Sequence, residues 1–109
     1  MMEIRLTSNP STGYNWNLNI SNINILELVC DDYNSNNELI GSGGVKLYRF
    51  NILNEGEVTL TFCYERSWEK QEEPLTINYI LHVKDDLQVE VKEMKANKED
   101  QDVPLPTFN

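Results

Sequence analysis

The segment EVTLTFCY, residues 57–64, alternates bulky apolar side chains with smaller or polar ones along its whole length. Successive side chains of an extended chain point to opposite faces, so the bulky apolar residues share one face. These residues are Val58, Leu60, Phe62 and Tyr64. Such alternation is typical of a β-strand that covers a core with one face and meets water with the other.

The same alternation recurs on both sides of this segment, in residues 3–7, 16–20, 77–83 and 87–91. Residues 45–53 are apolar on both faces, and residues 23–29 fit a strand better than a short helical turn. Turn-forming clusters separate these segments, at 8–13, 31–37, 41–44, 54–56 and 65–74. Short strands with regular turn signals predict an all-β fold, a sandwich or a barrel.

Length and charge narrow the class of protein. The chain has 109 residues, which suits one domain, and a formal net charge of -9. Nucleic acids and anionic membranes bind clustered Lys and Arg, so this charge argues against both as partners. No apolar run approaches the ~20 residues of a membrane span, and residues 1–5 lack the apolar stretch of a secretory signal. We therefore expect a cytoplasmic protein, monomeric by default, with Cys30 and Cys63 reduced.

The composition changes after Val91. Residues 92–109 are charged, contain Pro104 and Pro106, and have few core-forming side chains. This predicts a folded domain over residues 1–91 and a flexible, acidic tail over 92–109. The last apolar group, residues 103–108, could pack on the domain or bind a partner, and a disordered end is the simpler interpretation.

The first of three notable loops joins two predicted strands. Pro10 restricts its own φ and the conformation of Asn9, and Gly13 can adopt a positive φ. These features predict a stiff projection, which loses little entropy on binding. A plain β-turn would show the same residues, so this loop alone is weak evidence. Its candidate binding residues are Asn9, Pro10, Ser11, Thr12, Gly13 and Tyr14.

Two further loops have unusual compositions. The glycine-rich loop lacks the Gly-Lys-Ser/Thr ending of a phosphate loop, so no nucleotide or other cofactor is expected. Its residues are Gly41, Ser42, Gly43 and Gly44. The third loop combines Trp and Arg, the residue types most enriched in binding hot spots. Its residues are Arg66, Ser67 and Trp68. The glycine-rich loop could simply be flexible, and the Trp of the third loop could simply be buried in the core. Each of these explanations is as good as a binding role.

Taken in order, the three loops resemble those of the chagasin-type inhibitors of papain-like cysteine proteases. That family shows Asn-Pro-Thr-Thr-Gly-Tyr/Phe-x-Trp, then Gly-x-Gly-Gly, then Arg-Pro-Trp, and the present chain matches with Trp16 completing the first motif. The resemblance covers residues 3–83. It implies an immunoglobulin-like β-sandwich whose three loops enter the protease cleft together and inhibit reversibly.

The resemblance also implies individual roles. Ser11 and Thr12 would lie over the catalytic Cys and His of the protease, without presenting a bond for cleavage. The glycine-rich loop would line the non-primed side of the cleft. Arg66 and Trp68 would dock on the primed side.

Three departures from the family stand out. Ser11 replaces Thr but keeps the hydroxyl, and Ser67 replaces Pro, which loosens the third loop at a cost of up to about 1 kcal/mol. The family also has a strand before the position of Glu3. Either the chain starts at an internal Met of a longer protein, or another segment covers that edge, and we hypothesise that the chain from Leu87 onward does so.

Two other classes of function fit parts of the sequence. An enzyme would need a nucleophile and a base, and Cys63 with His82 is a conceivable pair, although both lie on predicted strands. The spacing of the cysteines and the histidine does not fit a zinc site, so no metal is expected. The stronger alternatives are a non-inhibitory immunoglobulin-like binding or scaffold module and an inhibitor weakened by loss of its first strand.

Overall fold

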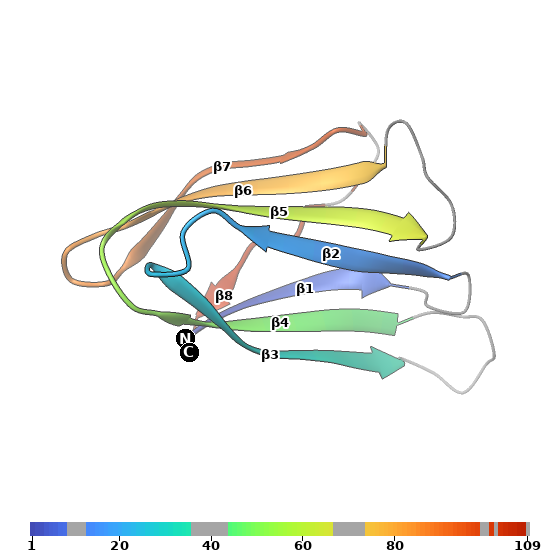
Figure 1. The fold of residues 1–109 in the computed structure, drawn as a ribbon, viewed down its shortest axis with the longest axis horizontal. Coiled ribbons are helices and arrows are strands. Elements are labelled where there is room, and N and C mark those ends of the chain that lie inside the picture. Colours follow the sequence, from blue (N-terminus) through green and yellow to red (C-terminus); the bar gives the residue numbers. More distant parts are fainter. Residues whose placement is uncertain (9–12, 36–43, 67–73, 99–100, 102, 109) are drawn as a thin grey trace.

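The computed structural model describes residues 1–8, 13–35, 44–66, 74–98, 101 and 103–108, and describes residues 33–35 by their backbone alone. Its strands are β1 (Met2–Ser8), β2 (Tyr14–Ile20), β3 (Leu26–Ser35), β4 (Gly44–Ile52), β5 (Gly56–Arg66), β6 (Leu75–Val83), β7 (Val89–Ala96) and β8 (Thr107–Phe108). Sheet A has the order β3-β4-β1-β8, and sheet B the order β2-β5-β6-β7. The two antiparallel sheets face each other (Figure 1), so the predicted immunoglobulin-like sandwich is confirmed. Within the described ranges no helix could span a membrane.

The core lies between the two sheets. It is filled by the alternating residues that the sequence predicts to share one face, and Val58, Leu60 and Phe62 of β5 are all buried. The Phe62 ring packs edge-on against Tyr48 and Tyr79, with ring centroids 5.0 and 5.8 Å apart. Full burial of one such side chain stabilises the fold by about 1.5–3 kcal/mol. This aromatic cluster therefore joins sheet A, which carries Tyr48, to sheet B.

The strand β3 differs from the sequence-based prediction. The sequence predicts a strand over residues 23–29 and a turn over residues 31–37, yet the strand begins at Leu26 and runs to Ser35. A turn precedes it, in which the amide of Ile25 donates to the Asn22 carbonyl at 3.1 Å. Polar residues continue the strand because β3 is an edge strand whose backbone pairs with β4, after a register shift between Leu28 and Cys30.

The chain beyond Val91 continues β7 and forms β8, although the sequence predicts a flexible tail there. β7 continues to Ala96 beside β6, and β8 pairs with the beginning of β1. Between them, the Tyr79 hydroxyl donates a hydrogen bond of 2.7 Å to the Pro104 carbonyl. Burial raises the pKa of Tyr79, which favours the protonated hydroxyl that this bond requires. The chain from Leu87 onward thus supplies an edge strand to each sheet.

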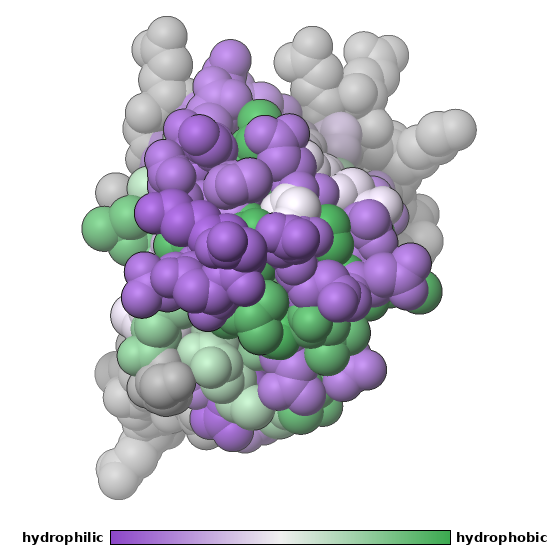
Figure 2. Space-filling model, turned by 90° about the vertical axis from the view of Figure 1, so that its left-hand side faces the viewer, coloured by the Kyte–Doolittle hydropathy of each residue, from purple (hydrophilic) through white to green (hydrophobic). Residues whose placement is uncertain are grey.

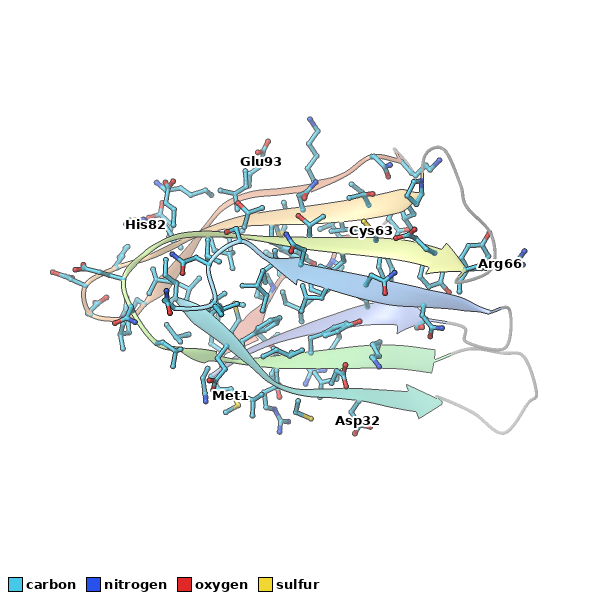
Figure 3. The ribbon with its side chains drawn as sticks, in the orientation of Figure 1. Met1, Asp32, Cys63, Arg66, His82 and Glu93 are labelled. Atoms are coloured by element: carbon cyan, nitrogen blue, oxygen red, sulfur yellow. The ribbon has the colours of Figure 1, made fainter. Side chains whose placement is uncertain are left out.

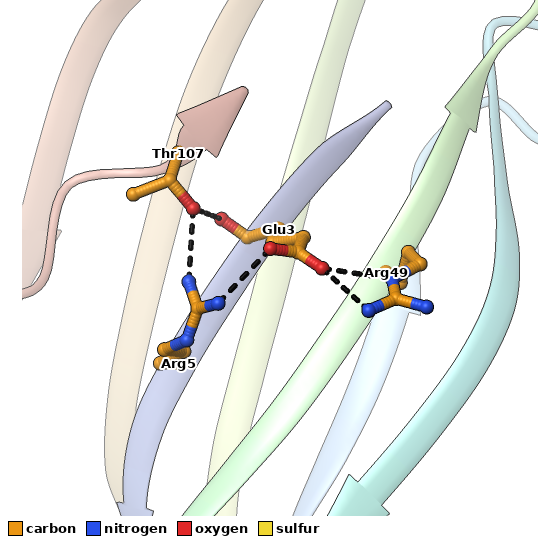
Figure 4. Close-up of polar contacts among 4 residues, drawn as sticks. All are labelled: Glu3, Arg5, Arg49 and Thr107. Carbon is orange, nitrogen blue, oxygen red and sulfur yellow. Dashed lines mark hydrogen bonds and ion pairs between the residues drawn. The ribbon is translucent and has the colours of Figure 1, made fainter. Parts of the chain in front are cut away.

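A compact ionic cluster on the outer face of sheet A helps to hold the edge strand β8 beside β1 (Figure 4). The buried Glu3 carboxylate accepts hydrogen bonds from Arg49 Nε at 2.8 Å and from Arg5 Nη2 at 3.0 Å. Arg5 Nη1 also donates to Thr107 Oγ1 at 2.9 Å. The bond from Arg49, followed by the weaker effect of Arg5, lowers the pKa of Glu3 despite its burial. One carboxylate therefore links β1, β4 and, through Arg5, β8.

Figure 2 looks onto the end of the sandwich where β6 turns into β7, and shows an apolar area among polar ones. A hollow of about 400 Å³ at this end is lined by Met1, Ile52, Leu87, Gln88, Val89 and Phe108. Leu87 has a φ of 65°, which is rare for a residue with a side chain. The turn is closed by hydrogen bonds between Lys84 and both Leu87 and Gln88.

Candidate functional site

Most of the predicted binding residues lie outside the described residues. These are Asn9, Pro10, Ser11, Thr12, Gly41, Ser42, Gly43, Ser67 and Trp68. The structure describes Gly13, Tyr14, Gly44 and Arg66, which are the positions where the three predicted loops join their strands. The geometry of the candidate site therefore comes from these junctions.

All of these junctions meet at one end of the sandwich, the right-hand end in Figure 1. In sheet A, Ser8 at the end of β1 pairs with Gly44 at the start of β4, and Ser35 of β3 also pairs with Gly44. In sheet B, Tyr14 at the start of β2 pairs with Arg66 at the end of β5. The strand register thus brings together the starting points of three segments that are far apart in sequence.

Hydrogen bonds link the two sheets near this end. The indole Nε1 of Trp16 in β2 donates to the Thr7 carbonyl of β1 at 3.1 Å. The Tyr48 hydroxyl of β4 donates to the Trp16 carbonyl at 3.4 Å. Burial, and to a lesser extent the nearby Asp31 carboxylate, raises the pKa of Tyr48 to about 12, so the hydroxyl keeps its proton at neutral pH. The loop junctions of sheet A are therefore held in a fixed position relative to those of sheet B.

A stack of aromatic side chains runs from the core to this end. Tyr64 of β5 lies between two residues of β2, with its ring centroid 4.6 Å from that of Trp16 and 5.1 Å from that of Tyr14. The guanidinium carbon of Arg66 lies 4.5 Å from the centroid of the Tyr14 ring. Figure 3 shows Arg66 at the end of β5, beside the loop junctions. Arg66, which the family resemblance assigns to a protease contact, therefore packs on a side chain of its own chain.

Gly13 has the backbone conformation that the sequence suggests. Its φ is 85°, a value that glycine adopts without a steric penalty and that other residues rarely adopt. Gly13 precedes Tyr14 directly, so it sets the direction in which the chain enters β2. The positive φ at this position therefore explains why the first motif has a glycine here.

Tyr64 is a residue of this site that the sequence pattern assigns only to the core face of a strand. It is partly buried and joins Tyr14 to Trp16. Its role depends on the register between β2 and β5, which pairs Trp16 with Tyr64. The alternation within each strand does not show which residues of β2 and β5 are paired. Only the aromatic side chain of Tyr64 could have suggested a role for this residue.

The sheet register contradicts the enzyme interpretation. Cys63 pairs with Thr76, whereas His82 pairs with Glu57, which lies six residues before Cys63 in β5. At about 3.4 Å per residue the two side chains are roughly 20 Å apart. Figure 3 shows them at different ends of the same sheet. They cannot act together as a nucleophile and its base.

Comparison with known proteins gives consistent matches. The family model described as "Chagasin family peptidase inhibitor I42" matches residues 1–83. Amoebiasin-2 of Entamoeba histolytica is 31% identical in an alignment 78 residues long, which covers 69% of this chain and 63% of Amoebiasin-2. The chain thus spans less than two thirds of that relative. The crystal structure of the cysteine protease inhibitor EhICP2 from Entamoeba histolytica superposes with a TM-score of 0.65 at 30% identity, and the match covers 72% of this chain and 75% of that one.

Proposed function

The chain belongs to the chagasin family of peptidase inhibitors, and from this membership we propose that it reversibly inhibits papain-like cysteine proteases. The sandwich is the scaffold in this proposal, and the loops between β1 and β2, β3 and β4, and β5 and β6 block the active-site cleft together. The protein acts as an inhibitor and catalyses no reaction of its own.

The observation that carries the proposal is the meeting of the three loop junctions at one end. Ser8, Gly44 and Ser35 lie side by side in sheet A, and Tyr14 lies beside Arg66 in sheet B. A non-inhibitory binding module would have no need to bring these three particular motifs together. A cleft-blocking wedge requires it, because all three loops must reach the same protease at once.

The proposed contacts follow the family pattern. The first loop, with Asn9, Pro10, Ser11, Thr12 and Gly13, lies over the catalytic Cys and His of the protease. The glycine-rich loop of Gly41, Ser42, Gly43 and Gly44 lines the non-primed side of the cleft, where the lack of side chains allows close approach. The family pattern places Arg66 and Trp68, with Ser67 between them, on the primed side, and Trp68 is the expected hot spot.

The test is a titration of papain with the purified 109-residue chain and with a Trp68→Ala variant. We expect saturable one-to-one inhibition by the unchanged chain. Loss of a hot-spot aromatic costs about 2 kcal/mol or more, so Trp68→Ala should weaken inhibition about 30-fold. The matched control is Ile23→Ala, which removes an exposed apolar side chain at a turn remote from the loop junctions and should leave inhibition unchanged.

Reversibility is tested in the same experiment. After rapid dilution of the complex, protease activity should return, and mass spectrometry should find the inhibitor chain uncut. A chain that is folded by circular dichroism and yet leaves papain and a cathepsin L-like enzyme fully active would refute the proposed function.

A further inference from the structure

Arg66 and Tyr14 make a contact that joins two of the loops. They are directly paired across β2 and β5, and the guanidinium of Arg66 packs on the Tyr14 ring at 4.5 Å from its centroid. Tyr14 follows the first loop, and Arg66 precedes the third. A guanidinium in this position is attracted by the negative face of the ring, more strongly as the pair becomes shielded from water. Both residues are partly buried, so part of that shielding is present.

The pair is connected to the core. The Tyr14 and Tyr64 rings stack with an interplanar angle of 20°, and Tyr64 in turn contacts the buried Trp16. Trp16 donates a hydrogen bond to the carbonyl of Thr7, in the last part of β1. One continuous line of contacts therefore runs from the strand before the first loop, through the residue after it, to the residue that begins the third loop.

We propose that Arg66 and Tyr14 are positioning residues, which hold the two strand ends that carry the first and third loops in one fixed relation before the protease arrives. This inference rests on the proposed function and reassigns both residues, which the family pattern would place in contact with the protease. Loops that are fixed before binding lose less conformational entropy on binding. Without the pair, a smaller fraction of chains has both strand ends in the arrangement that suits binding, and the apparent affinity falls by that fraction.

The kinetics of inhibition separate positioning from direct contact. Loss of a positioning pair lowers the competent fraction of the free inhibitor, so the association rate constant falls while the dissociation rate constant changes little. Loss of a direct contact with the protease acts mainly on the dissociation rate constant. A change in global stability alone alters neither, provided that the variant remains folded at the assay temperature.

The experiment is a double-mutant cycle with Arg66→Gln and Tyr14→Leu, measured as rate constants for papain. Each single variant should associate about three- to tenfold more slowly. The double variant should be no slower than the worse single variant, because the pair is already broken. Tyr14→Phe keeps the ring and should restore association, and Lys95→Gln, which removes an exposed positive charge on β7, is the matched charge control.

Two results would overturn the proposal. One is additive effects, in which Arg66→Gln costs as much with Leu at position 14 as with Tyr. The other is an effect confined to the dissociation rate constant. Either would show that Arg66 contacts the protease independently of Tyr14.

A measurement on the free chain distinguishes failure of the proposed function from failure of the positioning role. NMR relaxation of the amides in residues 8–15 and 65–76 should show that Arg66→Gln increases motion in both segments, including the one without the substitution. If the chain does not inhibit papain but shows this coupled change, the proposed function fails and the positioning role stands. If motion increases only beside the substituted residue, the positioning role fails.

Discussion

Glu3 shows how a single residue controls the attachment of a strand. Its carboxylate lies on the outer face of sheet A and is buried, because Arg49 and Arg5 cover it and Thr107 follows on the other side of Arg5. A buried carboxylate is tolerated only when charged donors compensate for the lost water. The same residue therefore makes the stability of the folded chain depend on pH.

The sign of this dependence follows from the lowered pKa. In the folded state the pKa of Glu3 is below its ordinary value of 4.5, so the folded protein stabilises the charged form. The resulting stability is present above pH 4.5 and is lost as the pH falls through the folded-state pKa. We expect Glu3→Gln to be less stable than the unchanged chain at pH 7, and the difference to shrink as the pH falls below about 4.5.

The difference in stability between Glu3→Gln and the unchanged chain is measured by urea unfolding at a series of pH values. Glu27→Gln is the control, because Glu27 is an exposed carboxylate on β3 of the same sheet. A difference between Glu3→Gln and the unchanged chain that stays constant over the whole pH range would contradict the assignment.

At the scale of the elements, the strands with strict alternation were predictable and the others were not. Burial on one face imposes a period of two on β5 and β6, and their sequences show it without interruption. β3 was misplaced because Asp31 and Asp32 are turn-forming residues, and their strand conformation depends on pairing with β4. β8 has two residues and is defined by its contact with β1, at the other end of the chain. Local sequence contains neither of these pairings.

The segment before β8 is attached through Tyr79. The Tyr79 ring is buried in the core, and its hydroxyl donates to the Pro104 carbonyl at 2.7 Å. Tyr79→Phe removes this bond and keeps the ring, so it should cost about 0.5–1.5 kcal/mol of stability. Amide hydrogen exchange of Thr107 and Phe108 should become faster, because the segment leading to β8 is released.

Tyr48→Phe is the matched control for this change. The Tyr48 hydroxyl bonds at 3.4 Å to a carbonyl of β2 rather than to the segment before β8, so its removal should leave exchange in β8 unchanged. Equal exchange rates for β8 in the two variants would argue that Tyr79 does not attach the segment.

At the scale of the whole molecule, the two sheets keep the cysteines apart. Cys30 is exposed and pairs with Arg49, which places it on the outer face of sheet A beside the Glu3 cluster. Cys63 lies on the outer face of sheet B, with its sulfur 3.7 Å from Thr76 Oγ1. Packed sheets are about 10 Å apart, and a disulfide needs Cα atoms within about 7 Å. The two thiols therefore cannot pair within one folded chain.

This arrangement predicts two titratable thiols per chain in the absence of reductant. The exposed Cys30 should react with a thiol reagent faster than the partly buried Cys63, and Cys30→Ser should remove the fast phase. Full reactivity should appear without unfolding or reduction. A native chain with no free thiol and the mass of an intramolecular disulfide would contradict the arrangement of the two sheets.

The candidate site was predictable in part. The order of the three loop motifs indicated the family and suggested that the loops work together, and Gly13 has the positive φ that its place in the motif implied. The contact between Arg66 and Tyr14 was not predictable, because it depends on the register of β2 against β5. The family pattern assigns residues to a partner one by one, and it contains no information on which of them contact each other.

The pairing of Met2 with Phe108 has a practical consequence for how the protein is handled. Both ends of the described chain lie together, at the opposite end of the sandwich from the strand ends that carry the three loops (Figure 1). A tag, a fluorescent fusion or a link to a sensor chip added at either terminus would leave the loops facing the solution. Under the proposed function, chains displayed in this way on a bead would serve as an affinity matrix, from which a captured protease could be recovered intact and identified.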